Sequence, residues 1–261
     1  MKTDKYKKEH TKEQPANTTI EGRNAVLEAL NAGGAIDKIF IKQSPEGLKG
    51  TLRVIAAQAS ERGIIVSYAN GDKLDLLAQS RNHQGVVALC PAKEYSTIKE
   101  ILDVSRAKNE PPFILICDGI TDSYNFGAIL RTAAAGVHGV LIPKHRSITL
   151  SGQVSKSSAG AFEYIKVARV TNITAAIEEL QKNNIWVYAA DLRGTPVHSQ
   201  DFRGAAAIVI GAEGQGISRL VRQKCDAAVT IPIAGEISSL NASVAAGVLM
   251  YEVVRSREKQ R

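Results

Sequence analysis

The sequence predicts a two-part α/β protein, with a small α/β unit followed by a larger, mostly parallel sheet that helices cover on both faces. Three observations lead to this fold class. The chain of 261 residues exceeds the usual length of one domain. Short apolar runs alternate with helical patterns along most of the chain, and a polar segment containing Pro91 interrupts this alternation. We therefore expect domains at 18–90 and 98–261, joined by a linker at 91–97.

The composition indicates a globular protein with a basic surface. No apolar run approaches the length that spans a membrane, so no membrane association is expected. Lys and Arg outnumber Asp and Glu by 33 to 26, and the resulting net charge of +7 favours a polyanionic partner such as RNA. Charge alone does not decide whether the partner is a nucleic acid. Residues 1–17 lack the apolar stretch of a secretory signal, and we interpret them as a disordered basic tail.

The cysteines and histidines predict neither a disulfide framework nor a metal site. The three cysteines lie far apart without C-x-x-C spacing, which fits a reducing cytoplasm. The chain has no H-E-x-x-H pair, and no segment offers a nucleophile with an adjacent His and carboxylate. The five scattered histidines are expected to be structural or exposed.

In the amino-terminal unit, the apolar pattern predicts three helices that alternate with three strands, beginning with a helix. Its first helix has Val26, Leu27 and Leu30 at helical spacing, with glycines placed to end it. The six segments are 22–34, 36–41, 48–63, 63–69, 72–80 and 83–90.

Beyond the Pro111-Pro112 pair, strands and helices alternate again, and the strands are short, continuous apolar runs. Such strands indicate a parallel sheet, in which ligands bind at the carboxyl ends of the strands. The segments are 113–119, 125–136, 138–143, 154–162, 163–170, 173–184, 185–191, 205–211, 217–225, 227–233 and 238–257.

The first candidate segment follows the strand predicted at 113–119 and carries Asn125, Gly127 and Arg131. On a helix that begins near Asn125, both Asn125 and Arg131 could point toward the strand end. A planar amide and a forked guanidinium there suit recognition of phosphate and ribose. The alternative, which this segment taken alone favours, is that Asn125 caps the helix and Arg131 is solvated.

The second candidate segment is a glycine-rich loop after the strand predicted at 205–211. Gly211, Gly214 and Gly216 allow the backbone to approach a ligand closely, but their order differs from the dinucleotide fingerprint. Glu213 within the loop would repel phosphates and favours a positive or neutral group such as a sulfonium. The alternative is a tight turn with Glu213 exposed.

The third candidate segment joins a strand ending at 231–233 to a long final helix. Ser238, Ser239 and Asn241 open this helix and could be ordinary caps. The small residues at 242–247 nevertheless allow another backbone to come close, either for ligand contact or for subunit packing.

Taken in order, the segments 125–133, 210–217 and 231–245 resemble the three signature motifs of the SpoU/TrmH family of RNA 2′-O-ribose methyltransferases. The stretches 21–30 and 83–88 resemble the small, L30e-like substrate-binding domain of that family. The resemblance spans nearly the whole chain. Within the family, the two-domain layout looks closest to bacterial enzymes that methylate a guanosine ribose in large-subunit (23S) ribosomal RNA.

The resemblance implies a deep trefoil knot of the SPOUT type that holds S-adenosylmethionine, and a homodimer formed through the knotted domain. Periodicity does not predict a knot, since threaded connections are nearly absent from protein folds. By motif match, the cofactor contacts would fall at Gly211, Ile231 and Leu240, with Ala190, Gly216 and Ile233 nearby. The implied catalytic set is Asn125, Arg131, Glu213, Ser239 and Asn241.

The chemistry of the residues agrees with this resemblance in outline. A sulfonium methyl group needs little activation, so the protein must position it in line and help to remove the proton of a weakly acidic ribose hydroxyl. The family's motif-one arginine corresponds to Arg131. Because arginine side chains stay protonated at neutral pH, we expect Arg131 to bind the adjacent phosphate and to stabilise the developing alkoxide.

Three alternatives remain open at this point. Transfer RNA could replace ribosomal RNA as the substrate. The chain could be a non-catalytic RNA-binding ribosome-assembly factor that retains the fold, although Asn125, Arg131, Glu213 and Asn241 are all present. A nicotinamide dehydrogenase is disfavoured because the order of the glycines is wrong for it.

Overall fold

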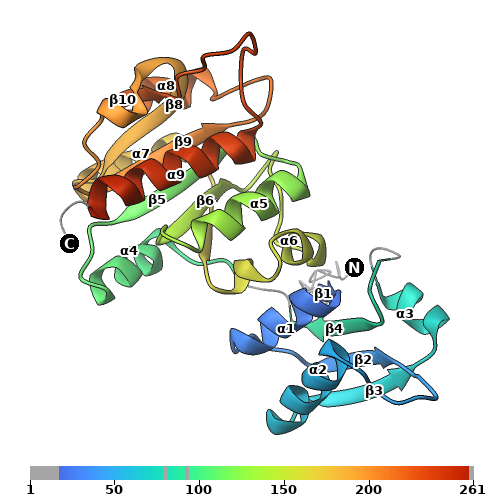
Figure 1. The fold of residues 1–261 in the computed structure, drawn as a ribbon. Helices are drawn as coiled ribbons and strands as arrows, with labels where there is room; N and C mark the ends of the chain where they lie inside the picture. Colours follow the sequence, from blue (N-terminus) through green and yellow to red (C-terminus); the bar gives the residue numbers. More distant parts are fainter. Residues whose placement is uncertain (1–17, 79–81, 92–93, 259–261) are drawn as a thin grey trace, which may run out of the picture.

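A computed structural model describes residues 18–78, 82–91 and 94–258. It contains two β-sheets, each with its own helices (Figure 1). The predicted tail at 1–17 lies outside the described residues, as do 79–81 at the end of the helix predicted at 72–80, 92–93 in the predicted linker, and 259–261. Among the described residues, no helix is both long and apolar enough to cross a membrane.

The amino-terminal sheet has four strands in the order β1-β4-β2-β3. β2 and β3 run parallel, whereas β4 runs antiparallel to both β1 and β2. All six predicted segments are present, and the strand β1 was not predicted because its four residues are too few to show a pattern. The elements are β1 (Thr18–Glu21), α1 (Arg23–Asn31), β2 (Lys38–Lys42), α2 (Thr51–Glu61), β3 (Ile65–Ala69), α3 (Gly71–Leu77) and β4 (Val86–Cys90).

The carboxy-terminal sheet has six strands in the order β10-β8-β9-β5-β6-β7, and all its pairs are parallel. The predicted parallel sheet is therefore confirmed. The strands are β5 (Phe113–Asp118), β6 (Gly139–Pro143), β7 (Lys166–Val170), β8 (Trp186–Pro196), β9 (Ala206–Gly211) and β10 (Ala227–Thr230). The helices are α4 (Ile98–Ala107), α5 (Ser123–Ala133), α6 (Gly152–Ser157), α7 (Ile173–Lys182), α8 (Arg219–Lys224) and α9 (Ala242–Glu258), with short 3-10 turns η1 (Ala161–Glu163) and η2 (Val197–Ser199).

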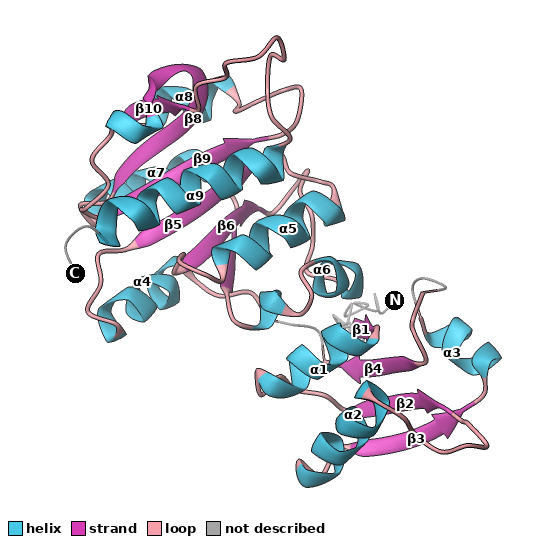
Figure 2. Ribbon diagram, viewed as in Figure 1, coloured by secondary structure: helices cyan, strands magenta, loops and turns pink. Residues whose placement is uncertain are grey.

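Helices cover both faces of this sheet (Figure 2). Side chains alternate along each strand, so each strand contributes apolar residues to both faces. Ile114 and Ile116 of β5 pack with α4, α7 and α8, while Phe113, Leu115 and Cys117 pack with α5 and α9. With both faces covered, polar side chains can meet a ligand at the carboxyl ends of β5 and β9, in the loops that follow these strands.

Several element boundaries differ from those predicted. Helix α4 was not predicted, although Thr97 and Glu100 form a capping box at its start. The strand predicted at 227–233 is too long. It ends at Thr230, and Pro232 lacks the N–H that would continue the ladder.

The two units contact each other through α6. Lys156 on this helix forms an ion pair of 3.0 Å with Glu21, which is only 2% exposed. The hydroxyl of Ser157 donates a hydrogen bond to the carbonyl of Ser123, at the start of α5. The amino-terminal unit is therefore joined to the helix that carries Asn125.

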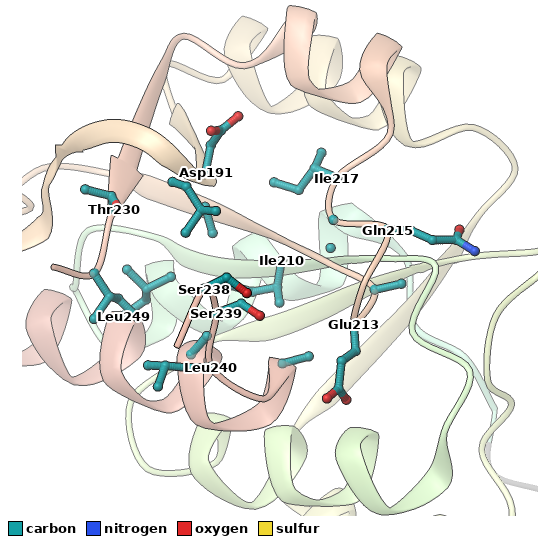
Figure 3. A pocket seen from close by; sticks show the side chains of 18 of the residues that line it. Asp191, Ile210, Glu213, Gln215, Ile217, Thr230, Ser238, Ser239, Leu240 and Leu249 are labelled. Carbon is teal, nitrogen blue, oxygen red and sulfur yellow. The ribbon is translucent and has the colours of Figure 1, made fainter. Parts of the chain in front are cut away.

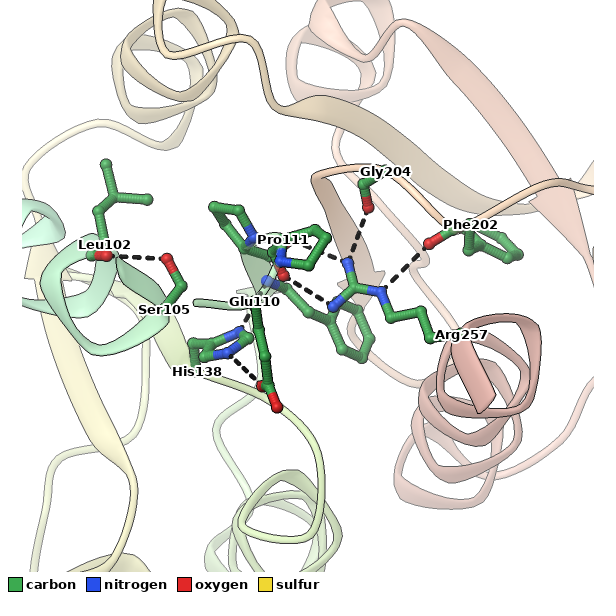
Figure 4. Close-up of polar contacts among 10 residues, drawn as sticks. Leu102, Ser105, Glu110, Pro111, His138, Phe202, Gly204 and Arg257 are labelled. Atoms are coloured by element: carbon green, nitrogen blue, oxygen red, sulfur yellow. Dashed lines mark hydrogen bonds and ion pairs between the residues drawn. The ribbon is translucent and has the colours of Figure 1, made fainter. Parts of the chain in front are cut away.

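A partly buried polar cluster holds the last helix against the start of β5 (Figure 4). The Arg257 guanidinium donates to the carbonyl oxygens of Pro111, Pro112, Phe202 and Gly204. Beside it, the Phe113 N–H donates to Nδ1 of the buried His138, while Nε2 of His138 lies 3.1 Å from the Glu110 carboxylate. This geometry requires a neutral imidazole, because a protonated Nδ1 could not accept.

We predict that His138 makes the folded state less stable in acid. Burial lowers the pKa of His138 below its ordinary value of 6.5, an effect that Glu110 opposes. Its contribution to the free energy of unfolding is therefore complete above pH 6.5 and is lost as the pH falls below it. When the free energy of unfolding in urea is measured at pH 7.5 and at pH 5.5, His138→Asn should lose less of it between the two pH values than the wild type does. Exposed His198→Asn is the control, and an unchanged loss in His138→Asn would contradict the assignment.

Candidate active site

Three segments that are far apart in the sequence meet at the carboxyl end of the large sheet. The Nδ2 group of Asn241 donates to Asn125 Oδ1 at 3.0 Å and to Glu213 Oε2 at 3.3 Å. Asn125 Nδ2 also lies 3.5 Å from Glu213 Oε2. These hydrogen bonds join the start of α5, the loop after β9 and the start of α9 into one cluster, which we call the Asn-Glu-Asn cluster.

Helix capping fixes the two asparagines of the cluster. Asp122, and not Asn125, caps α5, because its carboxylate accepts from the Asn125 N–H at 2.8 Å. The alternative in which Asn125 is the cap is therefore wrong, and its amide is left for the cluster. Asn241 both caps α9 and takes part in the cluster. Its Oδ1 accepts from the N–H groups of Ser243 and Val244, while its Nδ2 donates to Asn125.

The glycine-rich loop is a tight turn that directs Glu213 toward α5 (Figure 3). The Gly216 N–H donates to the Ala212 carbonyl at 2.8 Å, and Gly216 has a φ of +67°. A Cβ on Gly211 would lie 2.0 Å from the backbone carbon of Gly216, so only glycine fits there. Glu213 is exposed, as the tight-turn alternative predicts, but it also takes part in the Asn-Glu-Asn cluster.

A first cavity of about 540 Å³ lies between this loop, β10 and α9. All six residues predicted to contact the cofactor line it, as do Glu213 and Ser239. The six are Ala190, Gly211, Gly216, Ile231, Ile233 and Leu240. Much of the remaining wall is apolar, with Ile210, Ile217 and Leu249, so the cavity suits a flat, apolar ring.

Sequence reasoning missed Asp191, which also lines the first cavity. Its carboxylate accepts from the Arg193 N–H and forms an ion pair of 2.9 Å with Arg222 of α8. The Arg193 N–H, and to a smaller extent Arg222, lower the pKa of Asp191. Its position one residue after Ala190 was the available signal.

A second cavity of about 520 Å³ adjoins the first. The two share Ala212, Glu213 and Gln215, and Asn125 lines the second cavity. The Asn-Glu-Asn cluster therefore lies where the cavities meet. Arg131 lines neither cavity, because it is on the last turn of α5, about 9 Å along the helix from Asn125.

The fold and the site define a class of α/β proteins in which strand-end loops of a parallel sheet form a ligand cavity beside a small substrate-binding domain. Comparisons with known proteins identify that class. The SpoU rRNA Methylase family matches residues 112–251, and the family described as RNA 2′-O ribose methyltransferase substrate binding matches residues 19–96.

Relatives match over nearly the whole chain. YacO of Bacillus subtilis (strain 168), assigned to the TrmH family of tRNA/rRNA methyltransferases, is 43% identical over 91% of this chain and 95% of its own. A protein of Staphylococcus aureus (strain MSSA476) with the same family assignment is 46% identical over 92% and 97%. The SpoU methyltransferase AviRb from Streptomyces viridochromogenes, solved in complex with the cofactor AdoMet, shares the fold with a TM-score of 0.78 and 24% identity, covering 97% of this chain and 95% of that one.

The chain belongs to the SpoU rRNA Methylase family. It has the SPOUT fold preceded by a substrate-binding domain. It is accordingly an S-adenosylmethionine-dependent RNA 2′-O-ribose methyltransferase that acts on transfer or ribosomal RNA.

Proposed function

We propose that the first cavity binds S-adenosylmethionine and that the chain methylates the ribose 2′-hydroxyl of a guanosine in large-subunit (23S) ribosomal RNA. The Asn-Glu-Asn cluster is the observation that carries this proposal, because it stands where the two cavities meet. A methyl donor in the first cavity and a nucleotide in the second would touch at this border.

The first cavity fits S-adenosylmethionine in shape and charge. Its apolar walls, which include Ile231 and Leu249, suit an adenine ring, and the backbone of the glycine-rich loop offers polar groups beside them. Glu213 places a carboxylate at the border, where a positive sulfur would be attracted. When bound, S-adenosylmethionine supplies a methyl group already activated on a sulfonium.

The residues of the cluster divide the remaining tasks. Asn125 and Asn241 hold the Glu213 carboxylate through their amides. Glu213 accepts the hydrogen bond of the ribose hydroxyl and draws the proton away as the oxygen attacks. Ser239, inside the first cavity, contributes a hydroxyl that holds the donor in line.

We predict that Glu213→Gln slows methyl transfer about 10- to 100-fold, because the amide keeps the size of the side chain but loses a charge-assisted hydrogen bond. Transfer of labelled methyl groups to ribosomal RNA measures the rate. Glu236→Gln is the matched control, since Glu236 is exposed on the neighbouring loop and lines neither cavity. A Glu213→Gln rate within twofold of the wild type would remove Glu213 from the mechanism.

The ribosomal substrate is supported by the family match and by the two-domain layout, whereas the relatives' names leave transfer RNA open. Cytoplasmic action is part of the proposal, since Cys90, Cys117 and Cys225 are all free thiols. We disfavour a non-catalytic assembly role, because the hydrogen bonds among Asn125, Glu213 and Asn241 gather polar side chains where the two cavities meet.

We predict that cells lacking this protein lose one 2′-O-methylguanosine from 23S ribosomal RNA. Mapping 2′-O-methyl groups in ribosomal and transfer RNA, with and without the gene, measures this. Loss of a 2′-O-methyl group from transfer RNA alone would identify transfer RNA, and not ribosomal RNA, as the substrate. No loss from either RNA would favour the assembly factor.

The homodimer implied by the resemblance has a candidate surface on α9. Val244, Val248 and Tyr251 repeat at helical spacing and are 52%, 38% and 58% exposed. A neighbouring face of the same helix lines the first cavity through Ala245 and Leu249. We propose that a second copy packs on this stripe, and that Arg131 of the adjoining α5 contributes its phosphate contact from this side.

We predict that Val248→Glu produces monomers and lowers methylation, because each interface would bury an unpaired carboxylate. Sedimentation equilibrium measures the mass, and methyl transfer to ribosomal RNA measures the activity. Leu220→Glu is the control, because Leu220 on α8 is 69% exposed. If the wild type is itself monomeric, or if Val248→Glu remains dimeric, the stripe is not the interface.

A further inference from the structure

The second cavity is lined by charged side chains that do not belong to the Asn-Glu-Asn cluster. One wall carries the carboxylates of Asp118 and Asp122, at the end of β5 and the start of α5. Another part of the wall carries His145 and Arg146, from the loop that follows β6. A ligand that enters this cavity therefore meets carboxylates from the segment after β5 and a guanidinium from the loop after β6.

Backbone contacts fix both walls. Asp118 accepts from the Ser218 N–H at 2.8 Å, and Asp122 caps α5. The loop after β6 is joined to the first wall by the Ile148 N–H, which donates to the carbonyl of Ile120 at 3.0 Å. The cavity is therefore built from anchored segments.

Arg146 is held in an unusual conformation at the mouth of this cavity. Its φ of +53° lies in the left-handed region, which a residue other than Gly or Asn rarely adopts. The side chain is exposed, and within the described part of the chain no carboxylate forms an ion pair with it. On the far side of the loop, Arg169 donates to the carbonyl of Lys144 at 2.8 Å, which supports the turn that presents Arg146.

From these observations we infer that the second cavity holds the acceptor nucleotide, and that Arg146, assisted by His145, binds the 3′-phosphate of that nucleotide, a contact separate from the phosphate contact proposed for Arg131. The inference rests on the proposed function, because methyl transfer requires the ribose oxygen to lie about 3 Å from the methyl group, at the border marked by Glu213. The rest of the nucleotide must then extend into the second cavity.

The charges of the walls set its orientation. Asp118 and Asp122 repel a phosphate, so the phosphate turns toward Arg146, whose fork matches two phosphate oxygens. The base then lies on the carboxylate side. Arg146 is thus a positioning residue for the acceptor, at a place that Arg131 of the same chain does not occupy.

Arg146→Asn tests this inference without straining the turn, because asparagine tolerates a positive φ. Lys108→Asn is the matched control, since it also removes one exposed positive charge but lies outside both cavities. The probes are guanosine 3′-monophosphate and guanosine. Their binding is followed by nuclear magnetic resonance titration of protein saturated with S-adenosylhomocysteine.

Wild type and Lys108→Asn should bind the nucleotide about tenfold more tightly than the nucleoside, and Arg146→Asn should lose this preference. With in vitro transcribed 23S ribosomal RNA, Arg146→Asn should raise KM for RNA and lower the slope of log affinity against log salt by nearly one. Calorimetric affinity for S-adenosylmethionine should stay within twofold.

An equal preference for the nucleotide in Arg146→Asn, or an unchanged salt slope, would overturn the inference. No preference in the wild type would overturn it as well. Failure of S-adenosylmethionine to bind the wild type, or of the wild type to methylate any RNA, would instead remove the proposed function, because the nucleotide titration does not depend on turnover.

Discussion

The hydrogen bonds from Asn241 to Asn125 and Glu213 are the constraint on which the rest of the site depends. They join loops from β5, β9 and β10, which reach the same edge only because the whole sheet is parallel. Asn241 also caps α9, so the start of that helix and the position of Glu213 are fixed together. The cluster lies at the border of the two cavities, where Glu213 lines both of them.

The fold could be predicted well wherever apolar pattern and helix signals were strong. The strands at 113–119 and 205–211 are continuous apolar runs, and the structure places them side by side in the parallel sheet. Pattern failed at β1, which has only four residues, and at β10, which stops before Pro232. Helix α4 could have been found from its capping box, T-I-K-E, at 97–100.

The site could be predicted in part. Motif resemblance selected six residues that all line one cavity, because a strand-end loop keeps its position whenever the sheet keeps its order. Arg131 is exposed and lines neither cavity of this chain, since six residues on a helix rotate its side chain by about 240° from that of Asn125. Arg146 could not be found from local pattern, because its conformation belongs to a turn that only tertiary structure reveals. Asp191 stands next to a predicted contact, Ala190, but its ion pair with Arg222 joins residues far apart in the sequence.

The central claim is that this cluster stands between a methyl donor and a ribose oxygen. A crystal structure of the protein with S-adenosylmethionine tests it most directly. The account predicts the donor in the first cavity, with adenine among Ile231, Leu240 and Leu249 and the methyl group directed toward Asn125 and Glu213. A donor bound elsewhere, or one whose methyl group points away from the second cavity, would contradict it.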